Sequence, residues 1–371
     1  MIRVLHSVSN MDRAGIETML MNYYRHMDRE KVQFDFLCNK TKPGAYDEEI
    51  KKMGGRIYHT PGLNPAKYPQ YLKYMKQLFE EHKEYRIVEA HNGALGVYAL
   101  HAAKVNKIPV RIFHAHGASI TKDWKLPIKL VCKSMLPANM NHHFSCGVAA
   151  ARCYFGDKVV DNNDYELIPN AIEVERFIFN EKVRTAMRKK NGFENKHIIG
   201  HVGRFMTQKN HAFLIDVFEE VAKKDSQAML VLLGDGELQE EIRKKVNEKG
   251  LNDKVYFAGN VGNANEWYNA FDVFMLPSVW EGLPVVGVEA QANDLPCIFS
   301  ESVTKEIGLS KKAEFLSLQE TPLVWAQCVL DKLKDSNRKD NTQLITENNY
   351  NISYEAIKLQ ERYLELYEEQ K

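Results

Sequence analysis

The sequence predicts an α/β protein built from two doubly wound, Rossmann-like domains in tandem. Apolar runs of strand length alternate with segments of helical periodicity, the connections between them are short, and this alternation occurs in both halves of the chain. Strands and helices that alternate in this way form right-handed βαβ units and parallel sheets. A length of 371 residues accommodates two such domains, at roughly 150 residues each.

The first half supplies the strands and helices of the first predicted domain. Apolar runs of strand length occupy 2–8, 33–37, 56–60, 85–91 and 110–116. Segments predicted to be helical occupy 15–27, 46–53, 68–83, 94–105 and 125–136. The apolar stripe of the first of these helices, which would face a sheet, consists of Ile16, Met19, Leu20 and Tyr23.

The second half repeats the pattern with a clearer alternation. Predicted strands occupy 197–205, 228–236, 255–260, 272–278 and 296–300. Predicted helices occupy 209–224, 237–250, 264–271, 283–293 and 353–370. Gly250 stands at the end of the second of these helices, where glycine commonly terminates a helix.

The predicted domains are joined by the segment 166–177, in which Pro169 and Asn170 interrupt the pattern. We therefore expect an N-terminal domain over 1–170 and a C-terminal domain over 171–352, with the final helix in 353–371 joining the first domain. Open α/β sheets bind ligands in the crevice at the carboxyl ends of their strands. Two such sheets in tandem favour an enzyme with two substrates over a scaffold protein.

Composition and charge exclude several classes of protein. Hydrophobic residues make up 44% and charged residues 27%, which is typical of a globular protein and not of a disordered or collagen-like one. The net charge of +1 argues against a surface built for nucleic acid. However, the segment 51–150 contains 15 basic and 5 acidic residues, whereas 171–371 contains 26 and 32. This asymmetry predicts different partners for the two halves.

Cysteine spacing and hydropathy indicate the compartment. The six cysteines include no C-x-x-C pair and lie in or beside apolar runs, as free thiols do in a reducing cytoplasm. The longest uncharged run, 134–151, contains Pro137, two asparagines and two histidines, so it is a poor membrane span. The apolar stretch at the N-terminus is shorter than a signal peptide requires. We expect a cytoplasmic protein that is soluble or attached peripherally to the inner face of the membrane.

Glu281 and Glu289 are the strongest candidate site residues. Glu281 follows a predicted strand, and Glu289 lies further along the next helix, at an offset of roughly 8 Å from the helix start. This offset is close to the separation between the sugar and the ribose of a nucleotide sugar, whose diphosphate would lie at the helix N-terminus. The alternatives are that Glu281 caps the helix and that Glu289 is a solvated surface residue.

Two cations follow the first strand of the second domain. Gly203 stands at the turn, and Arg204 and Lys209 follow it at the carboxyl end of the strand. Two cations that face a diphosphate would stabilise the charge that develops on a leaving group. The alternative is that both form ordinary surface ion pairs. The sequence contains neither a D-x-D triplet nor a Cys/His spacing typical of zinc sites, so we expect no metal.

Several strings in the second half resemble one known family. GHVGRFMTQKNHAFLIDVF (200–218), LLGDGELQEEI (232–242) and S-x-W-E-G-L-P-x-x-x-x-E-A (278–290) resemble the C-terminal domain of the family 4 retaining glycosyltransferases. IPNAIEVERF (168–177) resembles the interdomain motif of that family, with Ala171 at the position where glycine is usual. The resemblance implies the GT-B fold, in which two Rossmann-like domains face a central cleft. It also implies a hexosyltransferase type of activity that uses a nucleotide-sugar donor.

The resemblance assigns donor-binding roles in both domains. Arg204 and Lys209 would contact the diphosphate, Glu281 would face the donor sugar, and Glu289 would accept hydrogen bonds from the ribose hydroxyls. The glycine in A-G-I-E would allow phosphate and sugar to approach the backbone, although Ala14 replaces the first glycine of the family motif. The remaining donor-binding candidates are Gly15, Gly203, Gly282 and Leu283.

Histidines at strand ends complete the implied site. His116 in H-A-H-G matches the family histidine beside the donor sugar and is the catalytic candidate, together with Glu281, Arg204 and Lys209. His114 points the same way in a strand and competes for this role. His91 in E-A-H-N-G is a candidate for the acceptor cleft. The mechanism usually proposed for the family is a front-face substitution in which the leaving phosphate deprotonates the acceptor.

The donor and the acceptor are also expected from the resemblance. I-R-V-L-H near the N-terminus and H-A-H-G are similar to bacterial capsule and exopolysaccharide transferases, which mostly use UDP-sugars and extend polyprenyl-diphosphate-linked saccharides. We therefore expect a UDP-sugar donor, a lipid-linked or saccharide acceptor and no nucleic-acid partner. The alternatives are a GDP-sugar with a soluble acceptor, and a non-catalytic homologue that binds a nucleotide sugar. An NAD-dependent oxidoreductase is disfavoured, because the G-D-G-E stretch 234–237 lacks the third glycine of that motif.

A basic amphipathic segment occupies 122–133. Its lysines recur every three or four residues and are interleaved with apolar side chains, which suits an anionic membrane surface or the diphosphate of a lipid. The alternative is an ordinary solvated helix face. Lys125 and Lys129 are the acceptor or membrane candidates within this set of lysines: Lys122, Lys125, Lys129 and Lys133.

Overall fold

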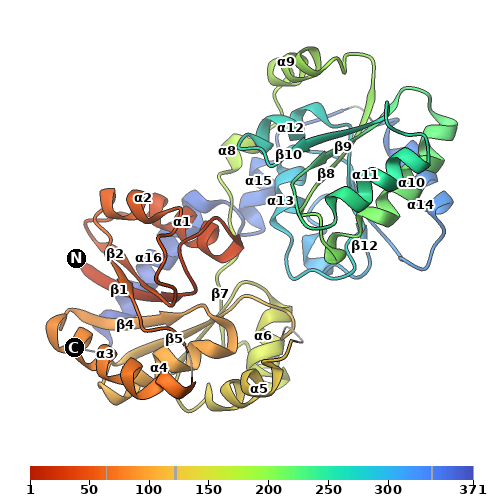
Figure 1. Cartoon of the computed structure of the whole chain (residues 1–371). Coiled ribbons are helices and arrows are strands. Elements are labelled where there is room, and N and C mark those ends of the chain that lie inside the picture. The colour runs from red at the N-terminus through yellow and green to blue at the C-terminus, as the bar shows by residue number, and fades with distance from the viewer. Residues whose placement is uncertain (64, 121–122, 336, 371) are drawn as a thin grey trace. The chain divides into compact units, whose positions relative to one another are not determined.

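The computed structural model describes residues 1–63, 65–120, 123–335 and 337–370 (Figure 1). The chain forms two compact units, and each unit is built on one parallel sheet. The first unit comprises Met1–Ala171 and Ile352–Lys371, and the second comprises Ile172–Asn351. The final helix, α16 (Ile352–Glu368), therefore belongs to the first unit.

The first unit contains a seven-stranded sheet in the order β3-β2-β1-β4-β5-β6-β7. Its strands are β1 (Ile2–Val8), β2 (Val32–Cys38), β3 (Ile57–His59), β4 (Tyr85–Ala90), β5 (Val110–Ala115), β6 (His142–Ser145) and β7 (Glu166–Leu167). The order reverses between β1 and β4, so the loops that follow these two strands diverge to opposite sides. In a doubly wound sheet, this switch point is where ligands bind.

Helices cover both faces of the first sheet. Alternate residues of β1 and β2, such as Val4 and Phe34, pack with α1 and with Tyr363 of α16, whereas Leu5 and Leu37 pack on the other face with α3 and α4. The helices of this unit, besides α16, are α1 (Gly15–His26), α2 (Asp47–Lys52), α3 (Tyr68–Glu81), α4 (Val97–Val105), α5 (Leu126–Met135), α6 (Val148–Phe155) and α7 (Asp157–Asp161), with short 3₁₀ turns η1 (Pro65–Lys67) and η2 (Gly93–Gly96).

The second unit contains a six-stranded sheet in the order β10-β9-β8-β11-β12-β13, and its switch point lies between β8 and β11. Its strands are β8 (His197–Val202), β9 (Ala228–Leu233), β10 (Val255–Gly259), β11 (Val273–Leu276), β12 (Cys297–Ser300) and β13 (Ala313–Leu316). Its helices are α8 (Val174–Phe177), α9 (Glu181–Asn191), α10 (His211–Lys224), α11 (Gln239–Glu248), α12 (Ala264–Ala270), α13 (Val285–Ala292), α14 (Pro322–Lys332) and α15 (Thr342–Glu347), with 3₁₀ turns η3 (Thr207–Lys209) and η4 (Lys305–Ile307).

The predicted strands are present, and the predicted fold class is confirmed. Three further strands escaped prediction: β6 begins with two half-buried histidines, β7 has only two residues, and β13 lies at a sheet edge with mixed burial. The helix predicted over 283–293 begins two residues later, because Pro284 adopts an extended conformation with ψ 104°. Gly250 follows α11 with a φ of +65°, the left-handed conformation expected after a helix.

None of the helices within the described residues has the length and apolar character that a bilayer span requires.

Candidate functional site

An ion pair joins the loops that follow β8 and β11 at the switch point of the second sheet. Lys209 Nζ lies 2.6 Å from Glu281 Oε1, and the two side chains are only 14% and 9% exposed. Ser278 Oγ donates to the same oxygen at 2.9 Å, and Gln208 Nε2 donates to Oε2 at 3.0 Å. The Val279 N–H donates to the Gln208 carbonyl at 2.8 Å, so the two loops are also connected by their backbones. Two residues predicted from separate motifs therefore form one group.

Glu281 is not a helix cap. The N-cap of α13 is Pro284, which has no side-chain acceptor for the helix start. The first N–H groups of α13 therefore have no side-chain acceptor among the described residues, and they carry the partial positive charge of a helix N-terminus. This arrangement suits an anion such as a phosphate. Gly282 and Leu283 lie between the carboxylate of Glu281 and this helix start.

Glu289 lies inside α13 and is half-buried. The Tyr268 hydroxyl donates to Glu289 Oε2 at 2.7 Å and also approaches the Val286 carbonyl at 3.2 Å. Burial raises the pKa of Glu289 above that of an ordinary glutamate, and the bond from Tyr268 acts in the opposite direction. This environment disfavours the solvated alternative for Glu289, and among the described residues no hydrogen bond to its Oε1 is found.

Arg204 lies apart from the Lys209–Glu281 pair. Its side chain is 68% exposed, and Nη2 lies 3.4 Å from Glu237 Oε2. Arg204 and Gly203 line a cavity of about 240 Å³ at the ends of β8 and β9. Gly234 in the facing loop has a φ of +128°, and a Cβ at this position would lie 2.2 Å from the Gly203 carbonyl oxygen. Glycine is therefore needed where these two loops approach each other.

The start of α1 is open in the first unit. The helix begins at Gly15, and its N-cap residue, Ala14, has no side-chain acceptor. A Cβ placed on Gly15 would meet no protein atom within 4 Å. Packing therefore does not explain the glycine, and the space beside it is available to a ligand.

Four histidines and a glutamate gather at the carboxyl ends of β1, β4 and β5. Since alternate strand residues share a face, Glu89 and His91 point the same way, as do His114 and His116. The register of β1 and β4 places His6 opposite Glu89. Strand positions far apart in the sequence thus converge beneath the switch point of the first sheet.

Hydrogen bonds connect these histidines in a row. His116 Nε2 lies 2.9 Å from His91 Nδ1, and His91 Nε2 lies 3.0 Å from His6 Nδ1. His114 Nδ1 lies 2.8 Å from Glu89 Oε1, and its ring stacks on that of His116 with 4.1 Å between centroids. We call this group the histidine row; its members are His6, Glu89, His91, His114 and His116.

Burial controls the charge of the histidine row. Desolvation lowers the pKa of His6 to about 4 and that of His114 to about 3. It lowers the pKa of His91 and His116 well below the usual value, and it raises the pKa of Glu89. All four imidazoles are therefore neutral near pH 7, and each has one N–H and one acceptor nitrogen.

The predicted histidines differ in their exposure to solvent. His114 and His91 are each 1% exposed, whereas His116 is half-buried. Of the two candidates for the catalytic role, His116 is thus the more accessible. His91, expected to line an acceptor cleft, instead lies beneath His116 and contacts other histidines. Sequence reasoning missed His6 and Glu89, although a single acid within the apolar run of β4 was a signal.

Two groups within the histidine row have the composition of a metal site. The donor atoms of His91, His114 and His116 lie within 4.8 Å of one another, as do those of His6, Glu89 and His91. In both groups, His91 nitrogens already share hydrogen bonds with neighbouring rings. Two other ring nitrogens of the row, His6 Nε2 and His114 Nε2, are buried and have no hydrogen-bond partner within the described residues.

The helix α5 presents an apolar surface beside its lysines. Trp124, just before the helix, is exposed, and so are four apolar residues within it: Ile128, Leu130, Val131 and Met135. Lys125 Nζ lies 5.0 Å from the centre of the Trp124 ring, and Lys129 Nζ lies 2.8 Å from Asp123 Oδ2. Lys122 lies outside the described residues. Exposed apolar groups on this scale commonly mark a contact with a membrane or a partner.

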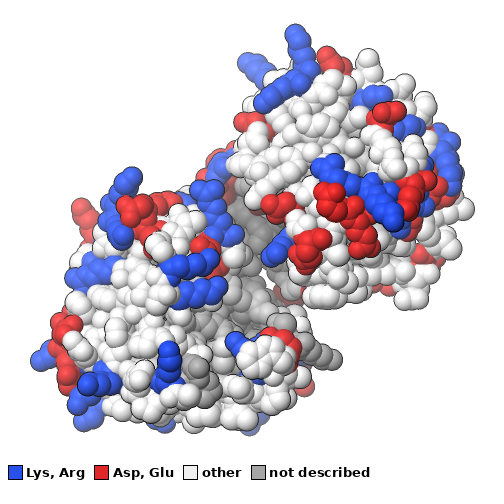
Figure 2. All heavy atoms as spheres, in the orientation of Figure 1, with Lys and Arg blue, Asp and Glu red and all other residues white. Residues whose placement is uncertain are grey.

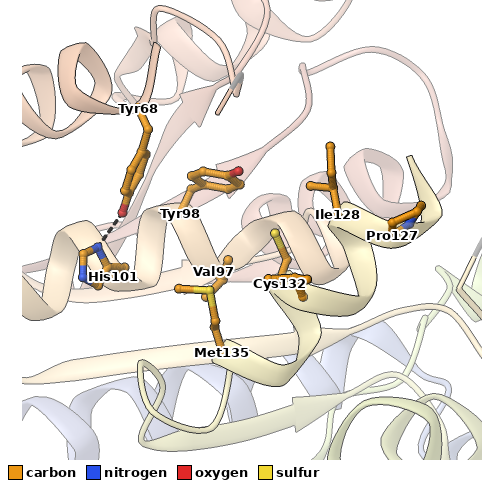
Figure 3. Close-up of a pocket in the computed structure, with 9 residues that line it drawn as sticks. Tyr68, Val97, Tyr98, His101, Pro127, Ile128, Cys132 and Met135 are labelled. Carbon is orange, nitrogen blue, oxygen red and sulfur yellow. Dashed lines mark hydrogen bonds between the residues drawn. The ribbon is translucent and has the colours of Figure 1, made fainter. Parts of the chain in front are cut away.

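An apolar cavity of about 460 Å³ lies between α4 and α5. Figure 3 shows Ile128 and Cys132 of α5 facing it from one side and Tyr98 of α4 from the other, with Tyr68 hydrogen-bonded to His101 at its edge. Both helices follow strands that end in the histidine row.

Lysines of the second unit are also paired with acidic side chains. On the visible face of the second unit, basic and acidic side chains alternate over α10 and α11 (Figure 2). Lys245 and Lys249 there lie 2.6 Å and 3.0 Å from carboxylate oxygens of Asp216. Local carboxylates therefore offset these cations.

Comparison with known proteins defines the class. The Anabaena protein HepE, solved in complex with UDP, matches 98% of this chain and 95% of its own with a TM-score of 0.74 at 15% identity. Such a likeness concerns the fold alone, which is the GT-B fold of glycosyltransferases. The Glycosyltransferase Family 4 model matches residues 13–176, and the Glycosyl transferases group 1 model matches residues 183–341.

Curated relatives agree with this class. The putative glycosyltransferase EpsF of Bacillus subtilis is 38% identical over 88% of this chain and 86% of its own. The capsular polysaccharide biosynthesis glycosyltransferase CapH of Staphylococcus aureus is 26% identical over 98% and 99%. An Escherichia coli enzyme named UDP-Gal:alpha-D-GlcNAc-diphosphoundecaprenol alpha-1,3-galactosyltransferase is 24% identical over 77% and 76%. The chain belongs to the group 1 and family 4 glycosyltransferases and is related to enzymes of exopolysaccharide and capsule biosynthesis.

Proposed function

We propose that this protein is a retaining, metal-independent glycosyltransferase that moves a sugar from a UDP-sugar to a lipid-linked or saccharide acceptor in capsule or exopolysaccharide synthesis. The observation that carries the proposal is the Lys209–Glu281 pair at the β8/β11 switch point. The pair stands beside the start of α13, so a cation, a carboxylate and a helix N-terminus are available together for a sugar diphosphate.

In this proposal, the bond between the anomeric carbon and the diphosphate oxygen breaks while the bond to the acceptor oxygen forms. The proton of the acceptor hydroxyl passes to the leaving phosphate, and no covalent enzyme intermediate occurs. Lys209, Arg204 and the start of α13 offset the charge that develops on the leaving group, which makes a metal ion unnecessary. Glu281 positions the donor sugar, with Gly203, Gly282 and Leu283 shaping the loops around it.

The remaining contacts bind the nucleotide and the acceptor. Glu289, oriented by Tyr268, accepts from the ribose hydroxyls. Gly15 lets the sugar phosphate approach the start of α1, and His116 accepts or donates a hydrogen bond at the reacting sugar.

Calorimetric titration with UDP and GDP tests the donor. UDP should bind more tightly, and Glu289→Gln should weaken UDP binding by about tenfold or more, because a bond to a charged acceptor is worth about 1.5–3 kcal/mol. Glu240→Gln, at a carboxylate 91% exposed on α11, is the matched control and should leave binding unchanged. Tighter binding of GDP would contradict the UDP assignment. UDP binding without sugar transfer to any extracted lipid acceptor would indicate a non-catalytic homologue.

We further propose that α5 attaches the protein peripherally to an anionic, cytoplasmic membrane face and that the cavity beside it holds an apolar segment of the lipid carrier. Support comes from the exposed Trp124 and Val131, from the lysines of the same helix, and from the apolar lining of the cavity. A volume of about 460 Å³ falls within the usual range for small-ligand sites.

The double variant Lys125→Glu/Lys129→Glu should sediment with anionic vesicles at least tenfold less than the wild type, since each basic residue near such a surface contributes about 1 kcal/mol. The matched control is Lys51→Glu/Lys52→Glu on α2, which should sediment as the wild type does. Equal sedimentation of the α5 variant and the wild type would refute the membrane contact. Retained activity on a soluble saccharide acceptor would show that the variant is folded.

A further inference from the structure

We infer that Glu89, acting through His91, holds His116 with its hydrogen on Nε2, so that Nδ1 of His116 presents a lone pair and accepts a hydrogen bond from a substrate hydroxyl. The inference rests on the proposed function in taking His116 as the residue that meets the sugar. Glu89 and His91 are positioning residues, since neither reaches the substrate itself.

Two side chains donate hydrogen bonds to the carboxylate of Glu89. The Tyr363 hydroxyl, from α16, donates to Glu89 Oε2, and His114 Nδ1 lies 2.8 Å from Oε1. Tyr363 keeps its proton, because burial and the neighbouring carboxylate raise its pKa far above the usual value. Burial raises the pKa of Glu89, and the bonds from these donors act in the opposite direction, because a carboxylate accepts from both at once and its ionised form is thereby favoured. The side chain is 1% exposed, and its charge therefore acts on its neighbours with little screening by water.

His91 Nε2 and His6 Nδ1 share one hydrogen, which either ring can carry. His91 Nε2 lies 3.5 Å from Glu89 Oε1, whereas His6 Nδ1 lies 4.0 Å from Oε2. If the hydrogen is on His6, the lone pair of His91 faces the nearer carboxylate oxygen. If it is on His91 Nε2, the N–H faces that oxygen and donates to His6 at 3.0 Å. The negative charge favours the hydrogen on His91 Nε2, although His6 then carries its own hydrogen on Nε2, which is buried without a partner among the described residues.

The position of the hydrogen on His91 determines its position on His116. A neutral imidazole has a single N–H, so His91 Nδ1 is an acceptor once Nε2 carries the hydrogen. The hydrogen in the 2.9 Å contact between His91 Nδ1 and His116 Nε2 must then belong to His116. Nδ1 of His116 is left as the acceptor, and it has no hydrogen-bond partner within the described parts of the chain.

The consequence is a specific demand on the substrate. A sugar hydroxyl can donate to Nδ1 of His116, whereas a group that offers only lone pairs, such as a carboxylate, is repelled there. Two histidine rings, His91 and His116, separate the charge of Glu89 from the substrate, which leaves the surface of the site neutral.

Nitrogen-15 NMR of the histidine rings tests the inference on the full-length protein without substrate. Ring nitrogens with and without hydrogen have well-separated chemical shifts, and His116→Gln identifies the His116 signals. In the wild type, Nε2 of His116 should carry the hydrogen. In Glu89→Gln the orienting charge is removed, and the population with hydrogen on Nδ1 should rise. His201, whose ring bonds the Met275 carbonyl in the second unit, serves as an internal control and should not change.

Activity provides the second readout. Glu89→Gln should lower kcat by about tenfold while UDP binding is unchanged, and Glu89→Asp should restore part of the loss. Hydrogen on Nδ1 of His116 in the wild type would overturn the inference, even if Glu89→Gln failed to fold. An unchanged His116 spectrum in a folded Glu89→Gln protein would overturn it as well. If the spectra agree and no transfer is found with any acceptor, the proposed function fails and the positioning by Glu89 stands.

Discussion

Glu281→Gln should reduce kcat/KM for sugar transfer by about 10²–10³-fold, the range typical for loss of one preorganised electrostatic group at a reacting centre. The amide keeps the size of the side chain but cannot balance the Lys209 ammonium 2.6 Å away, and it offers a donor where Ser278 and Gln208 require an acceptor. Lys209 would therefore move, and the charge on the leaving phosphate would be less well stabilised. Initial rates with saturating acceptor and varied donor measure the effect.

The control for this variant is Glu237→Gln, at an acid 58% exposed that only approaches Arg204. It should change kcat/KM by less than threefold. Thermal unfolding of both variants separates loss of fold from loss of activity. A Glu281→Gln protein that is folded and retains more than a third of the wild-type activity would contradict the role assigned to the Lys209–Glu281 pair.

Lowering the pH from 7.5 to 5.0 should reduce the free energy of unfolding by several kcal/mol. In the unfolded chain, histidines bind protons near pH 6.5. In the folded protein, burial lowers the pKa of His6 and His201 to about 4, that of His114 to about 3 and that of His211 to about 2. Between pH 6.5 and these values the unfolded chain binds more protons, so stability is complete above pH 6.5 and is lost as the pH falls.

The size of this effect follows from about 1.4 kcal/mol for each unit of pKa difference, or about 3 kcal/mol for His6 across its whole window. Glu89 acts in the opposite direction, because its raised pKa lets the folded protein bind a proton first. Urea unfolding at a series of pH values measures the sum. His201→Asn keeps a donor for the Met275 carbonyl. It should reduce the number of protons taken up on unfolding by about one, and so lower the slope of the unfolding free energy against pH. A pH-independent free energy in the wild type would refute the account.

Much of the second unit was predictable from local sequence. The strings around Gly203 and Glu281 combine a strand, a turn residue and a helix within a few positions, so these candidates could be named from the sequence, and the resemblance supplied their expected roles. The sequence predicted Lys209 and Arg204 as two cations that face a diphosphate. It did not show that Lys209 forms an ion pair with Glu281. That pairing depends on β8 and β11 being neighbours in the sheet, which periodicity does not specify.

The first unit was less predictable at the level of its site. His116 was named from the family resemblance and His114 from its position in the same strand, but their separate environments depend on burial by α16 and on the stacking of the two rings. Glu89 was read as part of an apolar strand, since a lone acid in such a run has no local partner. Its partners come from β5 and from a helix near the C-terminus, more than 200 positions away.

By itself, the sequence determined the fold class, the order of the elements, and the residue types at the carboxyl ends of the strands, because these follow from short-range periodicity and turn chemistry. Only the tertiary structure decided which of these residues meet. At each switch point, two strands that are distant in the sequence are neighbours in the sheet. Lys209 therefore meets Glu281, and His6 meets His91, although the members of these pairs are 72 and 85 positions apart. Burial then sets the charge of the joined groups, because the free energy of an ionised side chain depends on surroundings that neighbouring residues in the sequence do not supply.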